Sequence, residues 1–325
     1  MARAGTVIGK AMERQIDSRL HSPGNAEPPA LQALIPPEIL APKDRFARAR
    51  YMATLDPVRD CEQIGFLLAS CEFPWDTQRA LELALLRTYG VAKGTPLLVE
   101  TGELIRRTQK RYDDTALILA EIQENGVDHP RGRAALKRMN QQHGRYAIPQ
   151  DEYLYTLTTF VFEPIRWNAR FGWRRMTEGE RLATFHVWRR IGGRMGIRDI
   201  PQDYDELERF NVEFERANFR YSEHNHALAV ATRNLMLGWL LPRPLWPIAA
   251  PFIHAMLDEP MLRAVGFDPA PAPVRALVRG GMAVRRQVVR HLPPRRHPRL
   301  ITRRRHPSYP RGYRIEELGA DVGEQ

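Results

Sequence analysis

Residues 149–195 read PQDEYLYTLTTFVFEPIRWNARFGWRRMTEGERLATFHVWRRIGGRM, and this stretch predicts two successive helices. The first begins after Pro149 and runs to Glu163, because proline and acids suit the first turn of a helix. The second begins after Thr177, which forms a capping box with Glu180, three residues later. Apolar side chains recur at helical spacing in both segments, so the pattern indicates helix rather than strand.

Helical spacing continues on both sides of this stretch. Further helices are predicted from Asp56, from Trp75 to Gly90, and over residues 95–107, 111–125, 133–143, 203–218 and 221–240. Strands do not alternate with helices and period-two runs are almost absent, so little sheet is expected. The sequence therefore predicts a single all-α domain over residues 45–295.

The two ends differ from this body in composition. Residues 1–44 are rich in Pro, Gly and Ala and predict an irregular leader that wraps the body or stays disordered. The net charge of +11 is concentrated at the other end, where residues 275–325 hold thirteen Arg against four acids, or +9. Residues 296–325 are therefore predicted to form a basic, flexible tail.

The composition excludes a disulfide scaffold and a metal site made of four cysteines, and it argues against a transmembrane helix. Cys61 and Cys71 are the only cysteines, and ten residues of one helix would hold them about 15 Å apart, beyond disulfide reach. The N-terminus lacks the apolar core of a signal peptide, and no run of about 18 uncharged apolar residues is present. We expect a cytoplasmic protein that is at most peripheral to a membrane.

Residues 235–257 are the most apolar stretch, and they are interrupted by Arg243 and four prolines. Two tryptophans here and the basic tail suit an interfacial patch on an anionic membrane. A buried core loop explains the same composition equally well, so both interpretations stay open.

His186 carries the strongest local pattern, in LATFHVWRRIGGRMGIRD (182–199). On a helix it shares a face with Gly193, two turns later, and a glycine inside a helix costs about 1 kcal/mol relative to alanine. A neighbouring helix packed closely on the glycine explains this, as does a flat porphyrin whose iron His186 would ligate. Spacing alone does not decide between a structural histidine and a ligand.

His143 lies in the last turn of its predicted helix, where a cationic ring would meet the negative end of the helix dipole. A catalytic base or a second haem-facing group is the functional alternative. Three threonines between Thr156 and Thr159 indicate a polar surface facing a cavity, or hydrogen bonding back to carbonyls. The rings of His224 and His226 would point about 200° apart on a helix, which argues against a zinc site.

Four stretches in the same order resemble the catalytic domains of MpaB-type oxygenases and of rubber oxygenases, also called latex clearing proteins. They are ALELALLRTYGVAKGTPLLVETGEL, KRYDDT, AALKRMNQQHGRYAIPQDEYLYTLTTFVFEPIRWNARFGWRRMTEGE and HVWRRIGGRMGIRDIP. The likeness covers roughly residues 45 to 295. It implies an all-helical, globin-reminiscent core with b-type haem, and an oxidoreductase that cleaves a carbon–carbon double bond. The substrate would be hydrophobic and isoprenoid- or lipid-like.

The resemblance also implies roles for single residues. His186 would ligate the haem iron, and Thr156, with Thr159 nearby, would line the distal pocket. His143 would be a base or a partner of the haem site. Arg189 and Arg166 would neutralise the haem propionates. Gly193 would leave room for the porphyrin ring.

Two positions depart from the rubber oxygenase pattern. Glu152 and Tyr155 stand where those enzymes carry arginine and lysine, so polyisoprene is not an expected substrate.

Two further classes of function compete with an enzyme. The arginines of residues 275–314 could bind nucleic acid, but five prolines there argue against a recognition helix, so we do not expect this partner. A peripheral membrane protein that sequesters a lipid would keep the fold without the chemistry. No sequence feature sets the oligomeric state.

Overall fold

The computed structural model describes residues 30–320, which contain helices and no β-strand. The first half of the described chain contains η1 (Leu31–Leu34), α2 (Pro37–Leu40), α3 (Ala47–Met52), α4 (Cys61–Phe66), the π-helix η2 (Leu67–Glu72), α5 (Pro74–Thr88), α6 (Thr95–Glu100), α7 (Glu103–Arg106), α8 (Thr108–Asn125) and α9 (Pro130–His143). The second half contains α10 (Gln150–Arg170), α11 (Glu178–Arg194), α12 (Tyr204–Asn218), α13 (Glu223–Gly238), η3 (Arg243–Leu245), α14 (Trp246–His254), α15 (Glu259–Val265), α16 (Ala272–His291) and η4 (Ile315–Glu317). The all-α prediction is confirmed.

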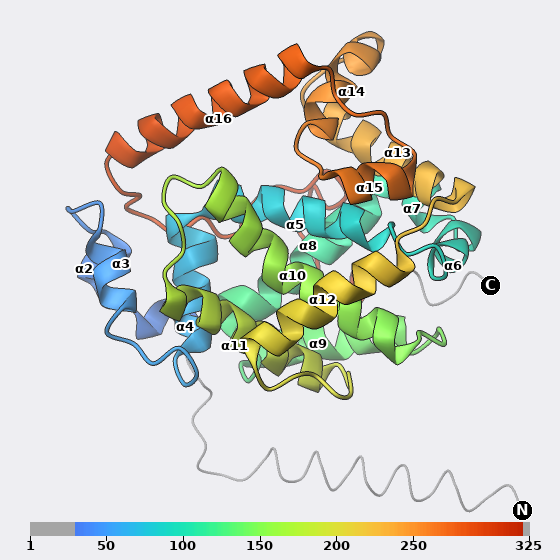
Figure 1. The fold of residues 1–325 in the computed structure, drawn as a ribbon. Coiled ribbons are helices and arrows are strands. Elements are labelled where there is room, and N and C mark those ends of the chain that lie inside the picture. The colour runs from blue at the N-terminus through green and yellow to red at the C-terminus, as the bar shows by residue number, and fades with distance from the viewer. Residues whose placement is uncertain (1–29, 321–325) are drawn as a thin grey trace, which may run out of the picture.

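Helix α10 lies at the centre of the fold, with α5, α11 and α12 around it (Figure 1). One of its faces, with Leu154 and Val161, belongs to the apolar cluster that includes α4, α8 and α11. Another, with Trp167, belongs to the cluster that includes α5, α13 and α15. The helix continues through Pro164 to Arg170, beyond its predicted end, because burial on both sides outweighs the hydrogen bond that proline removes.

Helix α11 begins as predicted. The Thr177 hydroxyl accepts from the backbone N–H of Glu180 at 3.3 Å, and Glu180 accepts from the backbone N–H of Thr177 at 2.8 Å. Close packing falls on Gly192 rather than Gly193: a Cβ at Gly192 would lie 2.5 Å from a methyl group of Leu157, whereas one at Gly193 would meet nothing within 4 Å. The helix-packing explanation for Gly193 is therefore wrong.

The helix predicted from Asp56 begins five residues later, at Cys61. The Asp56 carboxylate accepts from the backbone N–H groups of Val58 and Arg59, which stabilises a turn in place of the first helical turn. Cys71 lies in the π-helix that follows α4. Both cysteines are buried, and burial raises the pKa of each thiol to about 11, so they stay protonated at neutral pH.

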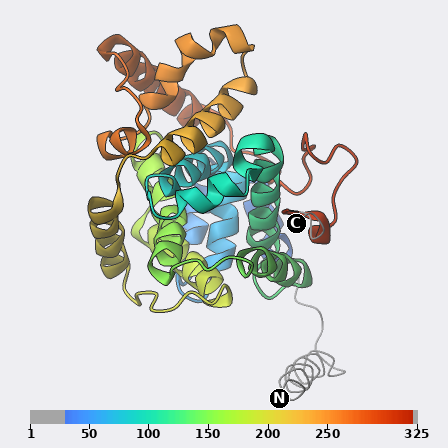
Figure 2. The same ribbon diagram turned by 90° about the vertical axis from the view of Figure 1, so that its right-hand side faces the viewer.

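The C-terminal segment, residues 299–320, runs along α8 (Figure 2). Acids of α8 hold it: Glu124 accepts from the backbone N–H of Ile301 at 2.6 Å, and the Tyr313 hydroxyl donates to Glu121 at 2.6 Å. Two more acids of the same helix bind the segment, Asp113 and Asp114. The tail over residues 296–325 was expected to be flexible. Its part from 299 to 320 is instead held in place by carboxylates that are nearly 200 residues earlier in the sequence.

The predicted leader is described only from residue 30. Leu31 and Ile35 are buried in the core cluster, so this part of the leader packs on the body, and residues 1–29 lie outside the described residues. Within residues 30–320, no helix combines the length and apolar character that crossing a bilayer requires. The apolar stretch 235–257 matches neither open interpretation fully: Leu240 is 79% exposed, while Ile253 is buried.

Candidate functional site

His143 ends α9, and its ring faces the first turn of α10. Its Nδ1 lies 2.8 Å from the Tyr153 hydroxyl, and the two rings meet edge to face with centroids 5.4 Å apart. A short connection from Gly144 to Pro149 brings the two helix ends together. The contact orients the imidazole, while Nε2 makes no hydrogen bond to any described residue.

Burial and the charge of nearby Arg111 lower the pKa of His143 to about 4. The ring is therefore neutral at pH 7, and the interpretation of His143 as a cation at the helix dipole is wrong. A neutral imidazole can ligate a metal or accept a proton.

Arg111 connects this histidine to a cavity. Its Nη1 donates to the Thr115 hydroxyl at 2.8 Å, and Thr115 lines the cavity. On α10, Tyr153, Thr156 and Phe160 follow at spacings of three and four residues and share one face. Phe160 lines the same cavity, so this face of α10 leads from His143 to the cavity wall.

The cavity, here called the α5–α8 cavity, has a volume of about 240 Å³. Its apolar wall comes from α5, α8, α10 and the end of α13, and consists of Leu81, Leu85, Ala116, Leu119, Phe160 and Trp239. Arg304, Arg305 and His306 of the C-terminal segment line its outer side. An apolar wall with a few polar groups is typical of a small-molecule site.

Glu82 is a buried acid in this wall. It accepts from the Tyr112 hydroxyl at 2.8 Å and pairs with Arg79, while burial raises its pKa to about 7. The carboxyl group thus titrates near neutral pH beside the cavity.

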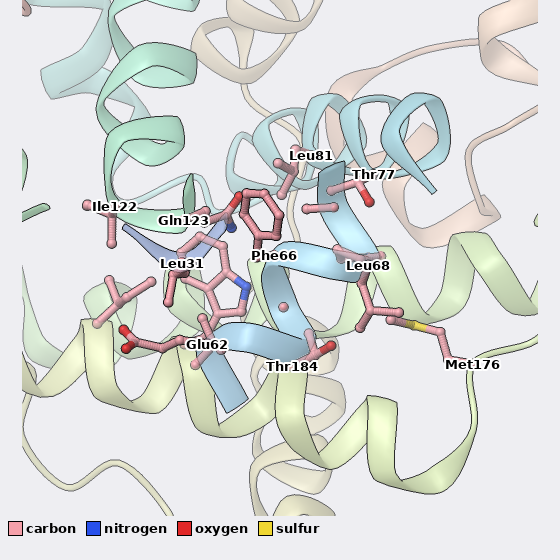
Figure 3. Close-up of a pocket in the computed structure, with 16 residues that line it drawn as sticks. Leu31, Glu62, Phe66, Leu68, Thr77, Leu81, Ile122, Gln123, Met176 and Thr184 are labelled. Carbon is pink, nitrogen blue, oxygen red and sulfur yellow. The ribbon is translucent and has the colours of Figure 1, made fainter. Parts of the chain in front are cut away.

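A smaller cavity of about 50 Å³ lies between α4, η2, α5, α8 and α11 (Figure 3). Leu81 and Gln123 line both cavities, so the two are neighbours. Phe160 of the larger cavity stacks on Trp188 of the smaller one, with centroids 4.9 Å apart. The smaller cavity has room for little more than a water molecule.

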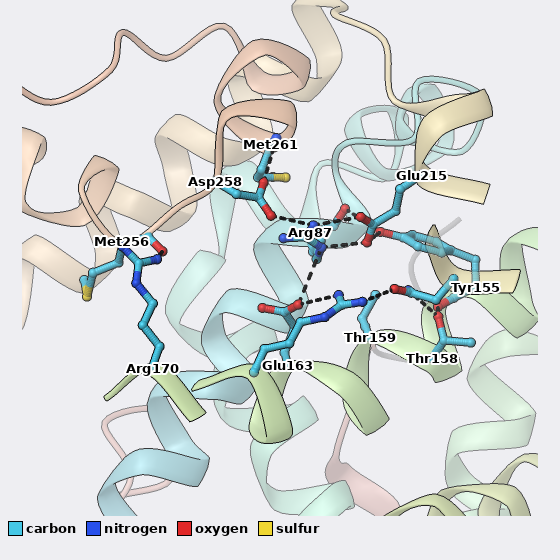
Figure 4. Close-up of polar contacts among 12 residues, drawn as sticks. Arg87, Tyr155, Thr158, Thr159, Glu163, Arg170, Glu215, Met256, Asp258 and Met261 are labelled. Carbon is cyan, nitrogen blue, oxygen red and sulfur yellow. Dashed lines mark hydrogen bonds and ion pairs between the residues drawn. The ribbon is translucent and has the colours of Figure 1, made fainter. Parts of the chain in front are cut away.

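A buried network of charges joins α5, α10, α12 and α15 (Figure 4). Arg87 donates to both carboxylate oxygens of Glu215, at 2.6 and 2.7 Å, and to Asp258 at 2.7 Å. Glu163 lies 3.5 Å from Arg87, and the Tyr155 hydroxyl donates to Glu215 at 3.1 Å. Tyr155 therefore points into this network.

Two of the predicted site residues make structural contacts. Arg166 pairs with Glu163 at 3.1 Å and donates to Asn211 at 2.6 Å, so its guanidinium is already engaged. The fully buried Thr159 donates to the carbonyl of Thr156. Of the two alternatives for the threonines, this hydroxyl therefore follows hydrogen bonding back to a carbonyl. Thr156 itself is half-buried, on the His143 face.

His186 lies elsewhere. Thr184, Val187, Trp188 and Ile191 of the same helix line the smaller cavity, whereas His186, like His143, lines none of the three described cavities. Its ring is half-buried, and burial with the charges of Arg189 and Arg190 lowers its pKa. Arg189 donates to Gln202, and Gly193 is exposed. The structure thus does not bring His186 and Thr156 to one cavity.

No metal-binding cluster is present in the described part of the chain, where no three His, Cys, Asp or Glu side chains are suitably grouped. His226 contacts the carbonyl of Val265 at 2.8 Å through Nδ1.

Several residues of this site were missed by sequence reasoning. Tyr153 contacts His143, Arg111 lies near it, and Thr115 lines the cavity. Arg111 and Thr115 fall within the quoted KRYDDT motif. That motif was the available signal, since an arginine and a threonine four residues apart lie on one helix face. Trp239 and the 301–307 segment gave no such signal.

Comparisons with known proteins cover both candidate histidines and do not distinguish between them. The family model described as "ER-bound oxygenase mpaB/B'/Rubber oxygenase, catalytic domain" matches residues 88–287, which include Arg111, His143, Thr156 and His186. ER-bound oxygenase mpaB' of Penicillium brevicompactum is 28% identical over 248 residues, which are 70% of this chain and 58% of that protein. ER-bound oxygenase mpaB of Penicillium roqueforti is 28% identical over 221 residues, 62% of this chain and 74% of that protein. The chain thus spans less than two thirds of the first of these relatives.

Proposed function

The chain belongs to the family of MpaB-type and rubber oxygenase catalytic domains, and from that premise we propose that it is a haem-dependent oxygenase. Its substrate would be hydrophobic and isoprenoid- or lipid-like. The reaction implied by the resemblance is oxidative cleavage of a carbon–carbon double bond.

The observation that carries this proposal is the position of His143. This neutral, oriented histidine lies at the start of the α10 face that leads to the apolar α5–α8 cavity. His143 keeps Nε2 free while Tyr153 holds Nδ1, which is the arrangement that ligating histidines adopt. The neighbouring Arg111 guanidinium could pair with a haem propionate. We therefore propose His143 as the iron ligand, whereas the resemblance predicts His186 for that role.

A neutral histidine beside an arginine is a donor set that haem uses, but His143 lines none of the described cavities and the volume of the α5–α8 cavity requires a movement. About 240 Å³ lies below the roughly 300–1,000 Å³ of most small-molecule sites. Residues 301–307 close the cavity from outside, and they are attached to α8 mainly through hydrogen bonds to its acids. The proposal thus requires the α5–α8 cavity to widen when haem binds.

Bound haem would supply the activation of dioxygen, which no side chain of the cavity can provide. The chain's own residues would position the reactants. Thr156 would offer a short hydroxyl donor on the His143 face, and Leu85, Leu119 and Phe160 would hold the hydrocarbon chain and exclude water. Glu82, whose pKa is about 7, could take up or release a proton at its carboxylate.

One spectrum tests the cofactor. The purified chain, reconstituted with haem, is expected to show a Soret band and to consume oxygen with an isoprenoid alcohol such as farnesol. The same protein without haem serves as the control. A colourless protein that rejects haem would contradict the proposal, and uptake of a lipid without oxygen consumption would support the lipid-binding alternative.

We also propose that the protein is cytoplasmic and contacts a membrane peripherally. Two of the exposed apolar side chains, Ile248 of α14 and Leu277 of α16, are 72% and 62% exposed, and α14 and α16 lie at one end of the molecule (Figure 1). Exposed apolar side chains on or beside an arginine-rich helix such as α16 suit an anionic bilayer.

Vesicle co-sedimentation tests this contact. Replacing Ile248 and Leu277 by glutamate is expected to reduce binding to phosphatidylglycerol vesicles by about tenfold, because two charges would enter the interface. Val212→Glu changes a 52% exposed side chain of α12 and serves as the matched control. Equal binding by all variants would contradict the contact.

A further inference from the structure

The outer side of the α5–α8 cavity carries unpaired positive charge. Arg304 and Arg305 line it from the C-terminal segment. Arg304 donates to the Gln78 side chain at 3.0 Å, a neutral partner, and Arg305 makes no hydrogen bond or ion pair with any residue between 30 and 320. Both side chains belong to exposed residues. Two guanidinium groups therefore border an apolar cavity without a counter-ion.

The acids that line the cavity cannot neutralise these arginines, because they already have partners. Asp113 accepts from the Gln109 side chain at 2.9 Å and from the backbone N–H of Ser308 at 3.0 Å, and it pairs with His306. Glu82 is occupied by Arg79 and Tyr112. The positive charge at the rim is thus available to a ligand.

Further arginines extend this charge along the surface. Burial lowers the pKa of Arg299, and the charges of Arg304, Arg295 and Arg79 lower it further. Like charges held this close repel one another, and an anion bound among them would relieve that repulsion. Planar guanidinium groups suit carboxylate and phosphate oxygens in particular.

Opposite this rim, the cavity wall is mainly apolar, with Glu82 and Tyr112 among its polar groups. Leu85 and Leu119 lie on α5 and α8, and Phe160 lies on the α10 face that leads to His143. A ligand that fills this cavity would place a hydrocarbon chain against the apolar wall and an anionic group against the arginines of the rim. A neutral hydrocarbon would leave the rim arginines without a partner.

We propose that the α5–α8 cavity selects an amphipathic anion, a hydrocarbon chain that ends in a phosphate or carboxylate, and that Arg304 and Arg305 bind its anionic end. This inference deepens the proposed function, because it takes the cavity as the substrate site. The chain would lie along Phe160, with its apolar end toward the His143 face.

Calorimetric binding to the purified full chain tests the inference with three probes: farnesyl diphosphate, farnesol and inorganic pyrophosphate. The wild-type protein is expected to bind farnesyl diphosphate at least about tenfold more tightly than either other probe, since farnesol lacks the anionic group and pyrophosphate lacks the hydrocarbon chain. Replacing both Arg304 and Arg305 by alanine should remove this preference and leave farnesol binding unchanged. Arg311→Ala, at an exposed arginine of the same segment that does not line the cavity, should change nothing.

A second variant locates the hydrocarbon chain. Ala116→Phe narrows the cavity and is expected to weaken both farnesol and farnesyl diphosphate, with pyrophosphate unaffected. Pyrophosphate binding as tight as that of farnesyl diphosphate would overturn the inference, as would an unaltered preference in the double variant. Binding to phosphatidylglycerol vesicles alone, lost in the double variant, would overturn it in favour of a membrane headgroup. None of these outcomes depends on haem, so failure of the proposed function is read separately, from the spectrum and oxygen uptake.

Discussion

A His143→Ala variant is expected to lose its haem and more than about 100-fold of its oxygenase activity. The reason is geometric: Nε2 of this ring is the free, neutral nitrogen on the face that leads to the α5–α8 cavity. Loss of groups that merely orient a metal ligand costs about 10–100-fold in metal affinity, so loss of the ligand should cost more. The measurements are the Soret absorbance per protein and the rate of oxygen consumption.

Tyr153→Phe provides a graded test of the same site. It removes only the hydroxyl that contacts Nδ1, so haem affinity should fall by about 10–100-fold while the ring stays in place. Unfolding curves and circular dichroism should match those of the wild-type protein.

Two variants on α11 serve as matched comparisons. His186→Ala and Gly193→Ala alter a half-buried histidine and an exposed glycine of α11, and neither residue lies beside the α10 face that runs from Tyr153 to Phe160. We expect both to retain the Soret band. If His186→Ala bleaches the protein and His143→Ala does not, the assignment from family resemblance holds and the proposal for His143 fails.

Arg87→Met is expected to lower the free energy of unfolding by about 3–5 kcal/mol. Arg87 is buried, and its guanidinium forms ion pairs with Glu215, Asp258 and Glu163. Methionine has a similar length but no charge, so the buried carboxylate of Glu215 would lose its counter-ion. That uncompensated charge, rather than a cavity, causes the expected loss.

Urea unfolding with an unchanged m-value measures this loss. Arg263→Met is the control, because its ion pair with Glu259 is exposed on both sides and should contribute at most about 1 kcal/mol. A double variant, Arg87→Met with Glu215→Gln, should recover part of the stability by removing the stranded charge. Equal losses for Arg87→Met and Arg263→Met would show that the network does not stabilise the fold.

Much of the fold was predictable because its signals are local. The capping box at Thr177 and the proline at position 149 depend on residues within one helical turn, and the structure has both helices where they were expected. Helical periodicity likewise predicted α12 and α13 to within two residues. Prediction was wrong at Asp56, where a side chain caps a turn, and beyond Glu163, where burial on both sides carries the helix through Pro164.

The candidate site was predictable only in part. The sequence placed His143, Thr156 and His186 on helices, but spacing within one helix does not say which neighbour a side chain meets. The structure directs His143 toward Tyr153 and Arg111, and it turns His186 away from the face of α11 that lines the smaller cavity. Likewise, composition made the C-terminal segment look flexible, and only the acids of α8 show what it binds.

The sequence by itself therefore determined the fold class, the starts of the well-capped helices and the family resemblance, since these depend on periodicity, capping and ordered motifs. Residues 149–195 already predicted two helices and contained Thr156 and His186. The structure places Thr156 on the α10 face beside His143 and His186 on α11, away from the face that lines the smaller cavity. Tertiary structure alone decided which histidine is oriented by a neighbouring hydroxyl, and which arginines border the cavity. Those properties arise from burial and from contacts between residues far apart in the chain, which no local pattern records.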